Sequence, residues 1–198
     1  MDSQSHYFDE EPNVQSRKST VDLILPDLTT TLTTDTGVFS SQRVDPGTNY
    51  LLQNVPMPKT TIESALDLGC GYGPIARTLV HRFPEAKILA IDVNQRALSL
   101  AEQNLSHLGV NVLHPDSVGL NLQFDLIWSN PPIRIGKSKL YDLLETWLCR
   151  LTTHGEAILV VQKHLGADSL LEWLNKNEFL AEKLSSKSGY RLIKATKK

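Results

Sequence analysis

From Ser64 onward, hydrophobic residues along the chain follow two alternating patterns. Short apolar runs predict buried strands, and these runs lie at 65–68, 88–91, 110–113, 124–128 and 157–161. Between the runs, apolar residues recur every three or four positions, which predicts amphipathic helices at 74–83, 94–109, 138–151 and 170–174. Strands that alternate with helices imply an α/β fold with a Rossmann-like, doubly wound and mostly parallel sheet.

Residues with strong positional preferences set the bounds of these helices. Asn94 and Ser138 are predicted N-caps, because their short polar side chains can accept a hydrogen bond from the first helical turn. Pro84 and Gly109 are predicted to end the first two helices. The C-terminal segments 179–184 and 190–193 flank a serine- and glycine-containing turn and predict an antiparallel β-hairpin.

The first 58 residues differ from the rest of the chain. Residues 1–18 are polar and lack periodicity, which predicts a loose N-terminal arm. Residues 21–25 and 28–32 alternate around a Pro-Asp turn and predict a β-hairpin, and a third short strand is expected at 37–40. Asp45 and Pro46 then fit the N-cap and first position of a short helix. We therefore predict an arm, hairpin and helix at 1–58 that pack on a main domain at 59–198.

Composition narrows the class of protein. The chain has 198 residues and a formal net charge of −2, with two cysteines and no apolar run near the roughly 20 residues that span a bilayer. The N-terminus lacks the features of a signal peptide, so the sequence predicts a cytoplasmic protein without membrane association. The six histidines show no metal-ligand spacing, and no metal is expected. The oligomeric state is left open.

A glycine-rich turn links the first predicted strand of the main domain to its first helix. Gly69, Gly71 and Gly73 are spaced G-x-G-x-G, and Asp67 lies two residues ahead of them. Glycines allow a sharp strand-to-helix turn and let a ligand lie against the backbone, while the helix start presents unpaired N–H groups. The turn therefore predicts a nucleotide-like cofactor, although a purely structural turn would look the same. The spacing differs from the G-x-G-x-x-G of dinucleotide-dependent oxidoreductases.

Carboxylates follow the next two predicted strands. Asp92 ends the second strand, where doubly wound folds place an acid that accepts hydrogen bonds from ribose hydroxyls. A helix-dipole partner is the alternative for this residue. Asp116 lies in a loop after the third strand, where an Asx-turn is an equally simple explanation. Because the carboxyl ends of parallel strands share one edge of the sheet, these groups are expected to lie near the glycine turn.

The sequence Asn130-Pro131-Pro132 ends the fourth predicted strand. The prolines stiffen the backbone, and the first biases Asn130 away from helix. The Asn130 side-chain carbonyl and a neighbouring main-chain carbonyl can then point into one small space. Two such acceptors would bind both hydrogens of an exocyclic NH2 group and orient its nitrogen lone pair for attack on an activated methyl group.

These motifs, in this order, resemble class I S-adenosylmethionine (SAM) methyltransferases. Asn-Pro-Pro resembles the subset that methylates exocyclic or amide nitrogens. Ile133 and Arg134, with Gly136-Lys137 downstream, look like single-domain relatives of the small-subunit rRNA guanine-N2 methyltransferases (RsmC-like). The segments 37–40 and 45–48 also look like that family.

The resemblance implies a set of roles. SAM would be the cofactor and small-subunit rRNA the partner, with Asn130, Pro131 and Pro132 as the catalytic turn. The cofactor-binding residues would be Asp67, Gly69, Gly71, Gly73, Asp92, Val93, Asp116, Ser117 and Asn130. Ile133, Arg134 and Lys137 would bind the substrate, with Lys139, Lys163 and His164 near the same rim. The segment 39–48 would close over the cofactor.

Three alternatives stay open. The first keeps methyl transfer to nitrogen but changes the acceptor from guanine N2 to adenine N6 or a protein glutamine amide. Ile133 opposes it, because those enzymes usually carry an aromatic residue at this position. A dinucleotide-dependent oxidoreductase is a second alternative, which the glycine spacing opposes. A third is a SAM- or RNA-binding module without turnover.

Overall fold

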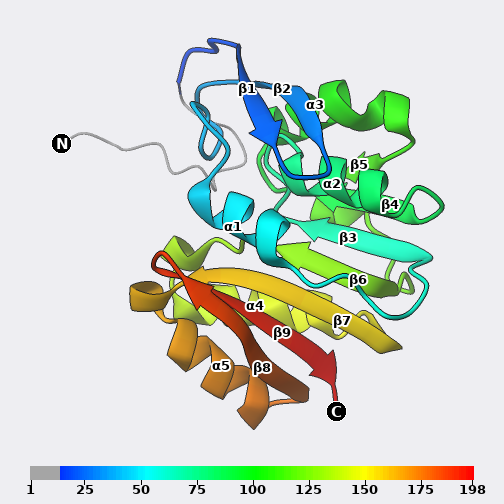
Figure 1. The fold of residues 1–198 in the computed structure, drawn as a ribbon, viewed down its shortest axis with the longest axis vertical. Coiled ribbons are helices and arrows are strands. Elements are labelled where there is room, and N and C mark those ends of the chain that lie inside the picture. The colour runs from blue at the N-terminus through cyan, green and yellow to red at the C-terminus, as the bar shows by residue number, and fades with distance from the viewer. Residues whose placement is uncertain (1–13) are drawn as a thin grey trace.

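The computed structural model describes residues 14–198 and contains a seven-stranded sheet with the order β5-β4-β3-β6-β7-β9-β8 (Figure 1). Its parallel strands are β3 (Ser64–Leu68), β4 (Lys87–Ile91), β5 (Asn111–Leu113), β6 (Phe124–Ser129) and β7 (Leu151–Gln162). At one edge, β9 (Tyr190–Lys197) lies antiparallel to both β7 and β8 (Phe179–Lys187). The predicted α/β class, the mostly parallel sheet and the antiparallel C-terminal hairpin are confirmed.

Helices cover both faces of this sheet and create two apolar layers. One layer contains α1 (Pro46–Asn54), α2 (Pro74–Arg82) and α3 (Gln95–Leu105), and the other contains α4 (Lys137–Leu148) and α5 (Ala167–Lys176). Successive strand residues alternate between the layers, because neighbouring side chains in a strand point to opposite faces. Leu126 and Trp128 belong to the first layer, and Ile127 belongs to the second.

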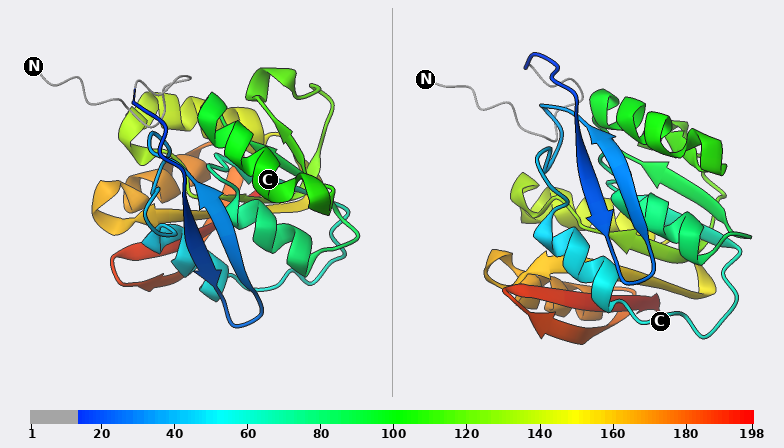
Figure 2. Two further views of the ribbon diagram at one scale, coloured as in Figure 1. Left: turned by 90° about the horizontal axis from the view of Figure 1, so that it is seen from above. Right: turned by 45° about the horizontal axis from the view of Figure 1, so that its top comes forward.

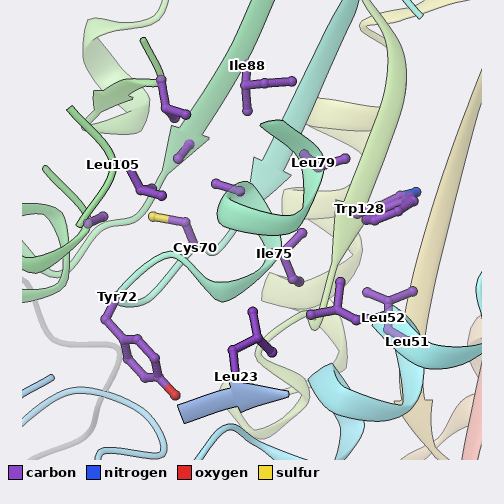
Figure 3. Close-up of a cluster of buried hydrophobic side chains, with 14 of the residues drawn as sticks. Leu23, Leu51, Leu52, Cys70, Tyr72, Ile75, Leu79, Ile88, Leu105 and Trp128 are labelled. Carbon is purple, nitrogen blue, oxygen red and sulfur yellow. The ribbon is translucent and has the colours of Figure 1, made fainter. Parts of the chain in front are cut away.

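The N-terminal hairpin forms a second, two-stranded sheet from β1 (Ser19–Ile24) and β2 (Thr29–Thr34). It lies beside α2 and α3 (Figure 2), and its inward residue Leu23 lies in the same buried cluster as Leu51 and Ile75 (Figure 3). At its turn, Asp27 accepts two hydrogen bonds from the Arg82 guanidinium (2.7 and 3.0 Å). The hairpin therefore shares its apolar core with the main sheet.

Several predicted bounds were wrong, and backbone geometry explains the first. The expected strand at 37–40 is a series of turns, since Gly37 and Ser40 have φ of 81° and 55°, which an extended strand excludes. The helix predicted to reach Gly109 stops at Leu105, and a short 3₁₀ turn, η1 (Ser106–Leu108), follows it.

The start of α4 and the strand after it also differ from the prediction. Ser138 does not cap α4, because the helix already begins at Lys137 behind Gly136, whose φ of 94° makes a sharp entry without a side-chain cap. The expected strand at 157–161 is longer and begins at Leu151, where pairing with Phe124 of β6 extends it.

The predicted arm at 1–18 lies mostly outside the described residues. Its last part is held by hydrogen bonds: Ser16 Oγ and the Arg17 backbone N–H both donate to the Asp35 carboxylate (2.6 and 2.5 Å). These contacts hold down the chain just before β1, because the acceptor lies immediately after β2. Residues 16 and 17 are therefore not loose.

The shared core predicts that the hairpin and α1 unfold together with the main sheet. Leu23 is fully buried, so Leu23→Ala should lower the free energy of unfolding of the whole chain by about 2–5 kcal/mol. Urea unfolding should show one transition with a lowered midpoint. Ile24→Ala on the exposed face of the same strand is the matched control and should change stability by less than about 0.5 kcal/mol. Two separate transitions, with only the minor one affected, would contradict the shared core.

Candidate functional site

A cavity of about 300 Å³ lies at the carboxyl ends of the central strands. Strand order reverses between β3 and β6, the point at which open α/β sheets bind ligands. The cavity walls come from the turns after β3, β4, β6 and β7, from the loop before α1, and from β9. They include Phe39, Asp45, Thr48, Gly69, Gly71, Asp92, Val93, Pro115, Asn130, Pro131, Pro132, Ile133, Arg134, Gln162 and Tyr190.

The three glycines of the turn after β3 have two different tasks. Gly69, Gly71 and Gly73 all have left-handed backbones, with φ of 77°, 55° and 94°. A Cβ added to Gly69 or Gly71 would meet nothing within 4 Å, whereas one on Gly73 would lie 2.6 Å from Leu105 Cδ1. The first two glycines therefore expose backbone to the cavity, and Gly73 allows the turn to pack against α3.

Asp67 lies behind the glycine turn and has no exposed surface. Its Oδ2 accepts a hydrogen bond from the Ala76 N–H (2.8 Å) and so ties β3 to the first turn of α2. The pKa of Asp67 is raised to about 8, mainly by burial and to a smaller extent by the nearby Asp92, while the hydrogen bond from the Ala76 N–H opposes the rise. The carboxyl is therefore mainly protonated at pH 7. Asp67 does not itself line the cavity.

Asp92 joins the end of β4 to the glycine turn. Its Oδ2 accepts from the Gly71 N–H (2.8 Å) and its Oδ1 from the Asn94 N–H (2.9 Å). Burial raises the pKa of Asp92, and these two backbone donors oppose the rise. Each carboxylate oxygen has further lone-pair capacity, so the group can accept hydrogen bonds from a ligand while keeping both contacts. Val93 beside it lines the cavity and is 36% exposed.

Asp116 and Ser117 lie in η2 (Pro115–Ser117), the short 3₁₀ turn after β5, and both are exposed. The Asp116 side chain is 91% exposed and lies 3.5 Å from His114 Nδ1. Pro115, rather than either of them, lines the cavity. The structure thus brings the first residue of this turn to the site but neither of the two predicted residues.

The Asn130 side chain is held from the side of α1. Its Nδ2 donates one hydrogen bond to Asp45 Oδ1 (2.8 Å) and another to Thr48 Oγ1 (3.0 Å). Among residues 14–198, no donor is hydrogen-bonded to Asn130 Oδ1. The next carbonyl, that of Pro131, accepts from the Ile133 N–H (2.8 Å) and keeps one free lone pair.

The predicted substrate residues divide into two groups. Ile133 and Arg134, in η3 (Ile133–Ile135), line the cavity, and Arg134 is exposed at its rim. Lys137 lies outside the lining, and its Nζ donates to Ser169 Oγ (3.3 Å). Lys163 and His164 are exposed in η4 (Lys163–Leu165) next to the lining residue Gln162.

Two residues of the far wall were missed by the sequence reasoning. Gln162 and Tyr190 are direct partners in the antiparallel β7–β9 pairing, and Gln162 Nε2 donates to Tyr190 Oη (3.1 Å). A Cβ on Gly47 would lie 2.8 Å from the Tyr190 ring, so a glycine is needed there for the ring to pack. The sequence predicted the C-terminal hairpin that contains Tyr190. It did not predict the register of this hairpin against β7, which brings Tyr190 beside Gln162.

Comparison with known proteins identifies the family. Residues 29–194 match the family model described as "Methyltransferase small domain". The chain belongs to this family. It is 37% identical over 198 residues to "Uncharacterized protein YbxB" of Bacillus subtilis (strain 168), covering 97% of this chain and 98% of that one. It is 33% identical over 154 residues to "Ribosomal RNA small subunit methyltransferase C" of Shewanella halifaxensis (strain HAW-EB4), covering 74% of this chain and 44% of the relative.

A solved structure has the same fold as this methyltransferase small domain. It is the T. thermophilus 16S rRNA N2 G1207 methyltransferase (RsmC) in complex with AdoMet and guanosine, with a TM-score of 0.76 and 23% identity. The match covers 94% of this chain and 52% of that one, so the chain spans about half the length of the RsmC proteins it matches. The resemblance to class I SAM methyltransferases is confirmed, and SAM is the cofactor of this methyltransferase family.

The residues present fit such a cofactor. Gly69 and Gly71 leave open space where side chains would otherwise stand, so a ligand can approach the backbone. Asp92 offers acceptor capacity beside them, 21 residues beyond Gly71 in the chain but joined to it by a hydrogen bond. Within the described part of the chain, no group of three or more His, Cys, Asp or Glu side chains could hold a metal ion. None of the helices in 14–198 has the length and hydropathy needed to cross a membrane.

The burial of Asp67 predicts a pH-dependent stability that Asp67→Asn should remove. Its raised pKa means that the folded protein keeps a proton that the unfolded chain has released, so the free energy of unfolding falls as pH rises from about 4 to about 8. Between pH 5.5 and 8.5, the free energy of unfolding, measured with urea, should fall by roughly 3 kcal/mol more in the wild-type than in Asp67→Asn. Asp142→Asn, on the exposed face of α4, should behave as the wild-type does. Equal losses for wild-type and Asp67→Asn would contradict the prediction.

Proposed function

We propose that this chain transfers a methyl group from SAM to an exocyclic amine of RNA, and that the amine is N2 of a guanine in small-subunit rRNA. The observation that carries the proposal is the Asn130 side chain, whose amide nitrogen is bound while its oxygen faces no donor among residues 14–198. Asn130 lines a cavity that also includes Gly69, Gly71 and Asp92.

The side of the cavity near β3 and β4 would hold the cofactor. Gly69 and Gly71 would let its methionine end approach the backbone, and Asp92 would accept hydrogen bonds from the ribose hydroxyls. The adenine would lie toward the turn that contains Asp116 and Ser117. Bound SAM supplies a methyl group on a sulfonium, which is already activated for transfer.

The side near β6 would hold the target amine. Asn130 Oδ1 and the free lone pair of the Pro131 carbonyl would each accept one hydrogen of a planar NH2 group. Held in this way, the nitrogen presents its lone pair in a fixed direction, and little proton transfer is needed before attack. Orientation and exclusion of water would then supply most of the rate.

The choice of RNA rests on the rim and on the relatives. Arg134 at the mouth, with Lys137, Lys163 and His164 nearby, would contact phosphates and so position the nucleotide. Ile133 stands where adenine- and glutamine-methylating enzymes usually carry an aromatic residue. The relatives named for small-subunit rRNA methylation share this domain. An enzyme with this substrate would work in the cytoplasm.

Mapping methylated guanines in small-subunit rRNA from cells with and without the protein tests the proposal. One N2-methylguanine should disappear without the protein and return when it is restored. In parallel, labelled SAM should be incubated with the purified protein and total RNA, DNA or protein extract. Label in adenine or in protein would show that the acceptor is wrong, and SAM binding without any labelled product would indicate a module without turnover.

Asn130→Ala should lower turnover about 100-fold, because the reacting amine loses one of its two acceptors and its orientation. SAM binding measured by calorimetry should stay within about twofold of the wild-type. Asn121→Ala, in an exposed loop before β6, removes the same amide elsewhere and should leave both values unchanged. Turnover of Asn130→Ala near that of the wild-type would exclude the proposed role.

Removing the rim charges should weaken RNA binding without affecting the cofactor. The double variant Arg134→Ala/Lys137→Ala should raise KM for RNA about tenfold at low salt, with a smaller effect at high salt, because phosphate contacts release counterions. Lys59→Ala/Lys87→Ala makes the same change of charge at two exposed lysines outside the cavity lining, one in the loop before β3 and one at the start of β4, and is the matched control. An equal rise in KM for both pairs would contradict a specific RNA-binding rim.

A further inference from the structure

We propose that Asp45 and Thr48 are positioning residues that fix which end of the Asn130 amide faces the cavity. This inference rests on the proposed function and deepens it, because it says why the site would accept an amine. Asp45 lies just before α1 and Thr48 in its first turn. Both are more than 80 positions away from Asn130 in the sequence. The sequence suggested a helix cap at Asp45 and, by resemblance, a segment 39–48 that closes over the cofactor, but no contact with Asn130.

Asn130 Nδ2 donates two hydrogen bonds, which equals the number of its hydrogens. The distance from Nδ2 is 2.8 Å to Asp45 Oδ1 and 3.0 Å to Thr48 Oγ1. An amide has two donors on nitrogen and two lone pairs on oxygen. With both donors bound, only the acceptor end of Asn130 remains for a ligand.

Asp45 makes this orientation the stable one. A carboxylate can only accept hydrogen bonds, so turning the amide over would place Asn130 Oδ1 against a negative charge and lose the contact with Asp45. The ambiguity that normally attends an asparagine amide is thereby removed by the chemistry of its partner. Thr48 alone would not decide the orientation, since a hydroxyl can donate as well as accept.

The positions of Asp45 and Thr48 are themselves fixed. Asp45 Oδ1 also accepts from the Gly47 and Thr48 backbone N–H groups (2.8 and 3.0 Å), which makes it the N-cap of α1. Thr48 is 5% exposed, and the next turn of the helix buries Leu51 completely. The two acceptors therefore belong to a packed helix start.

The fixed amide selects the chemical class of the target. An acceptor facing the cavity binds an N–H group and repels a carbonyl oxygen or an unprotonated ring nitrogen. Guanine carries both kinds of group, with NH2 at position 2 and a carbonyl at position 6. Asn130 held in this way would bind the first and reject the second, which directs the methyl group to nitrogen.

Thr48→Val tests the inference, because it keeps the shape of the side chain and the Asp45 cap and removes one acceptor. Turnover should fall about tenfold while SAM affinity and KM for SAM stay within about twofold. Thr48→Ser should recover most of the lost turnover. Thr78→Val is the matched control, since Thr78 is a fully buried helical threonine outside the cavity lining, and its turnover should be unchanged.

Asp45→Ser supplies a second variant. Serine is also a good N-cap, so α1 should stay capped while the shorter side chain no longer reaches Asn130. Turnover should fall at least tenfold, and in an Asn130→Ala background Thr48→Val or Asp45→Ser should cause little further loss. A loss of SAM affinity in these variants, or full additivity with Asn130→Ala, would overturn the positioning role.

A measurement without turnover separates this inference from the proposed function. In ¹⁵N spectra, the Asn130 side-chain NH2 signal, assigned by its absence in Asn130→Ala, should show slow hydrogen exchange that quickens in Thr48→Val. Fast exchange in an active wild-type enzyme would overturn the positioning role and leave the function standing. Slow exchange in a protein that methylates no RNA would overturn the proposed function, and the role in amine selection with it.

Discussion

A single carboxylate oxygen joins the parts of this protein that must meet for a site to exist. Asp45 Oδ1 accepts from two backbone N–H groups at the start of α1 and from the side chain of Asn130 after β6. The first two contacts fix the helix and the third fixes the amide. Because one oxygen atom makes all three contacts, the position of the start of α1 and the position of the Asn130 side chain after β6 depend on each other.

On the other side of the cavity, the carboxyl groups of Asp92 and Asp67 hold the glycine turn in place. Asp92 accepts hydrogen bonds from the N–H of Gly71 in the glycine turn and from the N–H of Asn94, the N-cap of α3. Its oxygens can still accept hydrogen bonds from a ligand. Asp67 supports the same turn from inside, but it is fully buried and has an oxygen without a hydrogen-bond partner among residues 14–198. Burial of that group destabilises its charged form, while the Ala76 N–H that ties it to α2 favours the charged form.

Local patterns were sufficient where the cause of a structure lies in neighbouring residues. The apolar runs identified all five parallel strands, and the Asp45-Pro46 pair identified the start of α1, because propensity and capping act over a few positions. The pattern at 37–40 failed, since the left-handed backbone at Gly37 and Ser40 depends on the route of the loop. Likewise, residues 151–156 did not show the pattern of a strand in the sequence, although pairing with β6 makes them the first part of β7.

Consecutive residues were enough to predict the fold class, the family and the end of the sheet at which the cavity lies, because motif spacing and strand ends are local properties of the chain. Tertiary structure decided which motif residues face the cavity: Gly69 and Gly71 do, whereas Gly73 packs on Leu105 and Asp116 points to solvent. It also brought Asp45 and Thr48 to Asn130 and paired Gln162 with Tyr190. Hydrogen-bond partners at such separations depend on helix packing and strand register, and neither is encoded in any local stretch of the chain.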